Sequence, residues 1–188
     1  MLTRFASLHR KLFPALIFCL LLGNGIRAQQ NTSGNMAVEK EQYTVQDFIQ
    51  GLLNKPVKDF NLTDIQGEKI NARDLKGKIV VMNFWFTACK PCILEMPHLN
   101  SLVAANRQQP VVFLAPAPEN EMQIKKFLKK YSFDYRIIPS SWELITDWKI
   151  ENFPTHLVID REGIIRQGFI GYAPDIAEKL QAEIDKLK

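Results

Sequence analysis

The sequence predicts an α/β domain with a mixed central sheet flanked by helices. Three buried-strand patterns, at 78–85, 111–115 and 156–160, are separated by stretches with helical spacing of apolar residues. Strands that alternate with helices are typical of an α/β sheet. The chain then closes with a hairpin over 160–170 and a final helix, so the predicted sheet is mixed and not wholly parallel.

Composition and charge exclude one class of partner. The chain has 188 residues, of which 46% are hydrophobic and 23% charged, as in a globular protein. The formal charge of +4 comes from the first 28 residues, which hold four of the 24 basic residues and no acidic one. The remainder is balanced, whereas a nucleic-acid-binding surface usually leaves a basic excess. We therefore expect no nucleic-acid partner.

The N-terminus has the pattern of a secretory signal peptide. Three basic residues precede the apolar run 12–22, and an acceptable cleavage site ends at Ala28. An uncleaved membrane anchor is the alternative, and Cys19 is a poor lipidation site because Phe18 precedes it. In either case we expect the domain outside the cytosol, in the periplasm. Membrane contact is expected only if residues 1–28 stay uncleaved, and then only through them.

We divide the rest of the chain into a leader, 29–55, and a main domain, 56–188. The leader is polar until residue 42 and then carries a short amphipathic helix, with Thr44 and Asp47 as its cap. Its apolar face consists of Val45, Phe48, Ile49, Leu52 and Leu53.

The main domain has two further sets of elements. It opens with a predicted strand over 57–62, a turn over 64–69 and a partner strand near Ile70. Its middle, between Pro116 and Ser140, holds a predicted helix and a strand over 135–138. The apolar face of that helix consists of Ile124, Phe127, Leu128 and Tyr131. A short helix over 142–148 follows.

Cysteine content indicates redox chemistry. Beyond the signal peptide only Cys89 and Cys92 remain. A structural disulfide that closes so short a loop adds little stability, and zinc normally needs four ligands, whereas only the separate His98 and His156 accompany the thiols. We expect no metal, and no cofactor other than a redox-active disulfide between the two cysteines.

The position of the motif explains its reactivity. A helix is predicted from near Cys89 to about Asn106, directly after a strand. Unpaired N–H groups at a helix start favour an anion, so Cys89 is the expected nucleophile, helped by the charge of Lys90. Cys92, one turn on, is the expected resolving thiol. Pro91 suits the first helical turn.

Glu95 follows Cys92 by three residues in an apolar context. A glutamate buried behind the thiols could accept and return the proton of Cys92. A solvated helix glutamate in a salt bridge is the alternative.

The segment 83–92, together with Glu95-Met96-Pro97 and with Phe153-Pro154-Thr155, resembles the active site of the TlpA/ResA-like thiol–disulfide oxidoreductases. These are extracytoplasmic members of the thioredoxin superfamily, and the resemblance covers roughly residues 56–187. It implies a thioredoxin-like fold with an N-terminal β-hairpin extension and a central helix–strand insertion.

The resemblance also implies roles for single residues. Pro154 matches the cis-proline that faces the cysteines, and Phe153 and Thr155 flank it where a substrate segment would bind. Glu95 matches a glutamate that the family uses beside the thiols, and Trp85 matches an aromatic residue that shields the site. Lys90 is unusual at its position, which leaves the reduction potential open.

Several functions fit the motif. The expected one is a reductase of disulfides in exported proteins, of the cytochrome c maturation type, recharged by a membrane thiol transporter. The same chemistry can run backwards in an oxidase or isomerase. A thiol peroxidase would need an arginine beside Thr87 and Cys89, and a copper-binding chaperone would need further ligands, for which His156 is a candidate.

Overall fold

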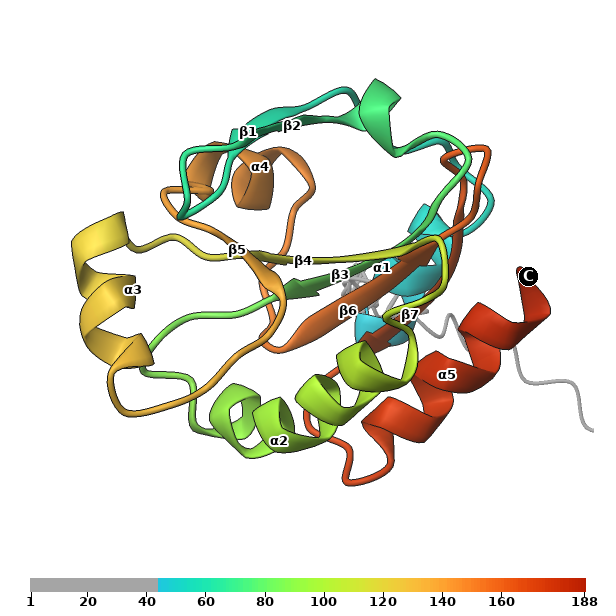
Figure 1. Cartoon of the computed structure of the whole chain (residues 1–188). Coiled ribbons are helices and arrows are strands. Elements are labelled where there is room, and N and C mark those ends of the chain that lie inside the picture. Colours follow the sequence, from blue (N-terminus) through green and yellow to red (C-terminus); the bar gives the residue numbers. More distant parts are fainter. Residues whose placement is uncertain (1–43) are drawn as a thin grey trace, which may run out of the picture. The chain divides into compact units, whose positions relative to one another are not determined.

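A five-stranded mixed sheet forms the centre of the fold (Figure 1). The strand order is β5-β4-β3-β6-β7. Neighbours β3, β4 and β5 are parallel, whereas β6 is antiparallel to β3 and β7 is antiparallel to β6. The strands are β3 (Ile79–Phe84), β4 (Val111–Pro116), β5 (Arg136–Ile138), β6 (Thr155–Ile159) and β7 (Ile165–Ile170). The predicted mixed sheet is confirmed.

The structure is a computed structural model that describes residues 44–188. The predicted signal peptide, 1–28, and the first part of the leader lie outside the described residues. Within 44–188, every helix is too short or too polar to cross a membrane.

Strand β3 is buried on both faces, as its unbroken apolar run predicts. Ile79 and Val81 point into a core that is shared with helices α2 (Lys90–Ala105) and α5 (Ile176–Lys186). The alternate residues of the strand point into a second core on the opposite face. Figure 1 shows α2 and α5 on one side of the sheet and the β1–β2 hairpin with α4 on the other.

The N-terminal hairpin pairs β1 (Asn61–Thr63) with β2 (Lys69–Asn71) and leads into a 3₁₀ turn, η1 (Ala72–Leu75). The expected strand over 57–62 is wrong in its first part, because only residues from Asn61 onward join a ladder. Val57 instead donates its N–H to the carbonyl of Gly163, and Pro56 forms a single bridge with Ile164. The backbone groups at this point are therefore used by the distant 160–164 turn.

The central insertion consists of α3 (Glu121–Leu128) and β5, and α4 (Trp142–Asp147) follows it. Helix α3 begins with a capping box between Asn120 and Gln123 and ends before Tyr131, whose ring stacks on that of Phe127. The insertion adds the edge strand of the sheet, and its helix follows β4 in the chain (Figure 1).

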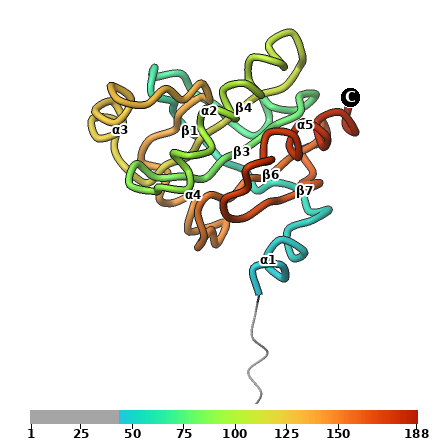
Figure 2. The backbone as a smooth tube through the Cα atoms, turned by 90° about the horizontal axis from the view of Figure 1, so that it is seen from below, coloured from blue at the N-terminus to red at the C-terminus, as the bar shows by residue number. Residues whose placement is uncertain are grey.

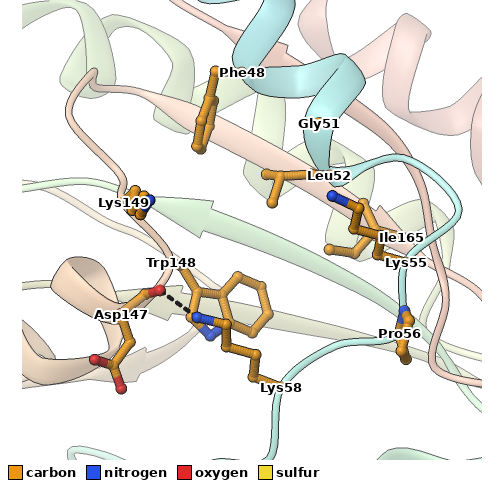
Figure 3. A pocket seen from close by; sticks show the side chains of 10 residues that line it. All are labelled: Phe48, Gly51, Leu52, Lys55, Pro56, Lys58, Asp147, Trp148, Lys149 and Ile165. Carbon is orange, nitrogen blue, oxygen red and sulfur yellow. Dashed lines mark hydrogen bonds between the residues drawn. The ribbon is translucent and has the colours of Figure 1, made fainter.

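Helix α1 (Val45–Leu52) has the predicted capping box, in which Thr44 and Asp47 bond each other's backbone N–H groups. It packs beside β7 (Figure 2), where Ile49 is buried against Gly168. A Cβ atom at Gly168 would lie 2.5 Å from Cδ1 of Ile49, so a larger residue there would displace the Ile49 side chain. Phe48 and Leu52 line a pocket with Trp148 beside the helix (Figure 3).

Candidate functional site

Cys89 is the N-cap residue of α2, in the loop that follows β3, and it forms a disulfide with Cys92. The N–H of Cys92 donates to Sγ of Cys89 at 3.3 Å. Helix α2 has 16 residues with Pro91 in its first turn. The unpaired N–H groups and dipole of such a helix favour a thiolate over a thiol at Cys89 once the disulfide is reduced.

Both sulfurs are shielded from solvent, and the second more completely. Cys89 is 3% exposed and Cys92 has no exposed surface. Lys90 is exposed beside them and Pro91 is half-buried. Cys89 is therefore the less enclosed of the two cysteines, and the order of nucleophile and resolving thiol stays a prediction.

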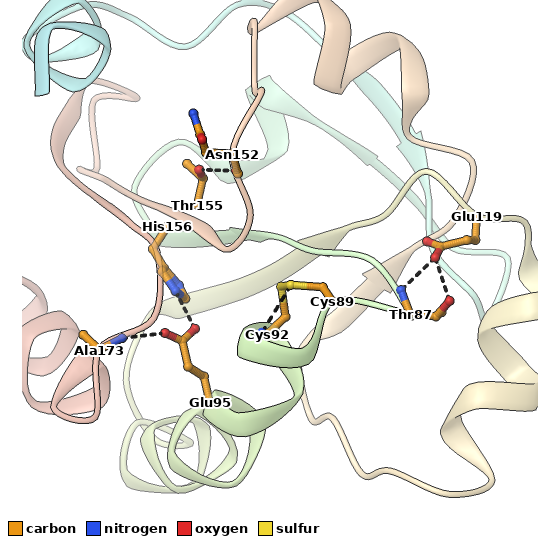
Figure 4. Close-up of a disulfide and its surroundings, with 9 residues drawn as sticks. All are labelled: Thr87, Cys89, Cys92, Glu95, Glu119, Asn152, Thr155, His156 and Ala173. Carbon is orange, nitrogen blue, oxygen red and sulfur yellow. Dashed lines mark hydrogen bonds and ion pairs between the residues drawn. A yellow bond between two sulfur atoms is a disulfide. The ribbon is translucent and has the colours of Figure 1, made fainter. Parts of the chain in front are cut away.

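Glu95 lies one turn beyond Cys92 and is fully buried. Its Oε1 accepts the N–H of Ala173 at 3.1 Å, and its Oε2 lies 3.0 Å from Nε2 of His156, which is also fully buried (Figure 4). The solvated salt bridge that was the alternative for Glu95 is excluded. A buried carboxylate held at both oxygens, on the same helix face as Cys92, is placed to exchange a proton with it.

One more polar side chain, that of Asn83, is buried beside this pair. His156 of β6 stands directly opposite Asn83 of β3 in the sheet register. Neither the Asn83 amide nor Nδ1 of His156 has a hydrogen-bond partner among the described residues. Buried polar groups without partners are uncommon in folded proteins and often mark functional sites.

The Phe153–Pro154 peptide bond is cis, as expected. Pro154 is buried and directly precedes β6, whose first residue, Thr155, pairs with the last residue of β3, Phe84. The rings of Phe153 and Phe86 meet edge to face at 5.3 Å. The cis-proline segment therefore lies at the same sheet end as the cysteines.

Three of the residues predicted to bind substrate are buried: Trp85, Pro154 and Thr155. Trp85 has no exposed surface; its ring packs against Phe127 and Phe133, and Nε1–H donates to the carbonyl of Ala115. The side chain of Thr155 is also fully buried and donates to the carbonyl of Asn152. Trp85 thus supports the site from beneath, and Thr155 can offer a substrate only its backbone.

A second carboxylate stands on the other side of the disulfide and was missed by the sequence reading (Figure 4). Oε1 of Glu119 accepts both the N–H and the hydroxyl of Thr87 at 2.7 Å. This contact ties the loop before Cys89 to the end of β4. It also engages the Thr87 hydroxyl that a peroxidase mechanism would use at Cys89. The only sign of this contact in the sequence was that Glu119 is a polar residue shortly after a buried strand.

Metal ligands are not gathered in the described part of the chain. Among residues 44–188, no three of the His, Cys, Asp and Glu side chains form a group that could hold a metal ion. His156, the candidate copper ligand, is occupied at Nε2 by Glu95.

Comparisons with known proteins agree with this geometry. Residues 53–168 match the AhpC/TSA family. The thiol-disulfide oxidoreductase ResA of Bacillus thuringiensis subsp. konkukian is 34% identical over 181 residues, which are 95% of this chain and 97% of that protein.

Solved structures of the same kind share the fold. A thiol:disulfide interchange protein of the thioredoxin family from Chlorobium tepidum has a TM-score of 0.63 at 23% identity, over 71% of this chain and 96% of its own. StoA from Bacillus subtilis has a TM-score of 0.56 at 27% identity, over 69% of this chain and 97% of its own. Together with the Cys89–Cys92 pair at the start of α2, these likenesses show that the chain belongs to the ResA-like thiol–disulfide oxidoreductases.

Proposed function

We propose that this oxidoreductase works outside the cytosol as a reductase of disulfides in other exported proteins, with apocytochromes as the expected substrate class. The observation that supports it best is the division of roles at the site. Cys89 caps a helix and keeps 3% of its surface exposed, whereas Cys92 has no exposed surface and lies one turn from Glu95. An attacking and a resolving thiol need these two environments.

The reaction begins with attack by the Cys89 thiolate on one sulfur of the substrate disulfide. The substrate S–S bond breaks, a bond forms to Cys89 Sγ, and the first substrate sulfur leaves as a thiolate. Cys92 then gives its proton to Glu95, and the new thiolate attacks Cys89 Sγ. The mixed disulfide breaks, the second substrate sulfur leaves, and two electrons have passed from the dithiol to the substrate.

The surroundings of Cys89 offer contacts for an extended substrate segment. Lys90 supplies a positive charge, and Pro91 and Phe153 supply partly exposed apolar surface. Leu94, 60% exposed, directly precedes Glu95, and Tyr172, 48% exposed, directly precedes Ala173, whose N–H donates to the Glu95 carboxylate. We assign the backbone around Phe153, Pro154 and Thr155 to pairing with the substrate.

The chain's organisation fits export. We propose that residues 1–28 direct secretion to the periplasm, by cleavage or as an anchor, that 29–55 is a leader ending in α1, and that 56–188 is the catalytic domain. A membrane thiol transporter is the proposed electron donor that returns the Cys89–Cys92 disulfide to the dithiol.

The equilibrium reduction potential of the Cys89–Cys92 pair tests the direction of electron flow. We expect a value near or below about −270 mV, as in thioredoxin, whereas a value near about −120 mV would indicate an oxidase instead. In parallel, Cys92→Ser should accumulate a mixed disulfide with a substrate peptide, because the resolving thiol is missing. Failure of the wild-type pair to cycle between disulfide and dithiol would overturn the proposal altogether.

A further inference from the structure

The contact between Glu95 and His156 joins two residues that are 61 positions apart and both fully buried. Glu95 comes from α2 and His156 from β6, so the contact spans the space between helix and sheet beneath the disulfide (Figure 4). Isolated buried charges are costly, and a carboxylate without water or a donor would hold its proton. A neighbouring group must therefore keep the Glu95 carboxylate able to accept a proton.

Two N–H groups are available for that task. The backbone N–H of Ala173 already donates to Oε1 of Glu95. Nε2 of His156 is the only ring nitrogen in contact with Oε2, at 3.0 Å, and an ionised carboxylate can only accept. We propose that His156 is a positioning residue of the redox reaction: its Nε2–H donates to Glu95 and keeps that buried carboxylate ionised and aimed as the proton acceptor of Cys92.

This role rests on the proposed function and adds a residue to it. When Cys92 gives up its proton, the S–H bond breaks, an O–H bond forms on Glu95, and the negative charge moves from the carboxylate to sulfur. The total charge of the buried cluster does not change, so the transfer needs no solvent. Nε2 of His156 keeps its own proton throughout, so the acquired proton resides on a carboxylate oxygen of Glu95.

Other groups around His156 do not compete for this function. Asn83 faces it from β3 and Phe169 from β7, and neither side chain titrates. Glu95 contacts it from α2. Tyr135, in the segment before β5, is close enough to feel the Glu95 charge; burial, and then that charge, raise the pKa of its phenol, so it stays neutral throughout. Lys90 and His98 are exposed.

The test separates the two thiol steps. The full chain, reduced, is mixed with an aromatic disulfide whose thiolate is coloured, so the first release reports attack by Cys89 and the second reports attack by Cys92. The variants are His156→Leu, which has no donor, His156→Gln, whose amide nitrogen takes the place of Nε2, and His156→Asn, whose amide nitrogen takes the place of Nδ1. His98→Leu is the matched surface control.

We expect the first release to stay within about twofold in all variants. The second should slow at least about tenfold at pH 7 in the Leu and Asn variants, with its pH midpoint about one unit or more higher, because losing a donor favours the protonated carboxyl. The Gln variant should stay within about threefold. In a Glu95→Gln background, His156→Leu should add nothing further.

The inference is overturned if a folded Leu or Asn variant keeps the wild-type pH profile of the second release, or if Gln is slowed as much as Leu. Should His156→Leu fail to fold, His156→Asn carries the same expectation. Loss of the first release in the unaltered chain would instead refute the proposed function, so the two failures are distinguishable.

Discussion

Two buried polar regions of this molecule differ in how completely their groups are paired. The turns at 64–67 and 160–163 each begin with a buried aspartate, Asp64 and Asp160, 4% and 5% exposed. In each, Oδ1 accepts two backbone N–H groups and Oδ2 accepts an arginine, Arg136 or Arg166. Beneath the disulfide, by contrast, the Asn83 amide and one His156 nitrogen have no partner in the described chain.

The difference separates stability from chemistry. A fully paired carboxylate stabilises the ionised form and locks its turn, and the glycine at the fourth position of each turn has a positive φ, 89° at Gly67 and 81° at Gly163. An incompletely paired cluster leaves a buried group free to change its protonation state. Substitutions should therefore alter stability at the turns and rate at the cluster.

The largest effect is expected at Glu95. Glu95→Gln keeps the shape of the side chain and the bond from Ala173 but cannot take a proton, so resolution of the mixed disulfide should slow by about 10² or more. Chemical denaturation of the oxidised protein should show stability unchanged or slightly higher. A large loss of stability with a normal rate of mixed-disulfide resolution would show instead that Glu95 stabilises the fold and does not serve the chemistry.

The turns should behave in the opposite way. Asp160→Ala and Asp64→Ala each remove the acceptor of two N–H groups and the partner of an arginine, and each should cost about 2–3 kcal/mol of unfolding free energy after allowing for the partial exposure of the arginines. Thiol exchange rates should stay within about twofold. Urea denaturation and the two-phase release assay measure both quantities on the same samples.

The stability that the two aspartate turns contribute should depend on pH. Burial opposes ionisation of Asp64, but Arg136 and the N–H groups of Glu68 and Gln66 outweigh it and lower the pKa. Burial is likewise outweighed at Asp160 by the Ile164 N–H and Arg166, which lower the pKa of its carboxyl.

A folded pKa below the unfolded one gives stability that is present at neutral pH and is lost as pH falls through the folded value. We expect unfolding free energy to decline below about pH 4, the ordinary range of aspartate. The two alanine variants should lose less on acidification than the parent protein does. Equal slopes for parent and variants would assign the acid sensitivity to other groups.

The smallest effect on stability is expected at Asn83. Asn83→Leu replaces an amide without partners by an apolar group of similar size, so unfolding free energy should stay within about 1 kcal/mol or rise. A loss of several kcal/mol would mean that the amide is paired in solution, by an internal water or by His156. Calorimetric melting of both proteins measures the difference.

Much of the fold could be predicted from local patterns. The apolar run of β3, the capping box of α1 and the CxxC motif at the start of α2 each appear where short-range rules place them. The errors are at positions where distant backbone competes. Residues 57–60 have strand composition, yet the N–H of Val57 donates to the carbonyl of Gly163 and these residues join no strand.

The sequence by itself determined the chemistry of this protein: two cysteines, their spacing and their place after a buried strand are contiguous features that require only local geometry. Only the tertiary structure decided which groups serve them. The register of β6 against β3 turns His156 toward Glu95 and opposite Asn83, and the fold of the insertion brings Glu119 to Thr87. Such contacts join residues that are 32 to 73 positions apart, and no periodicity within one segment encodes which side chains will meet.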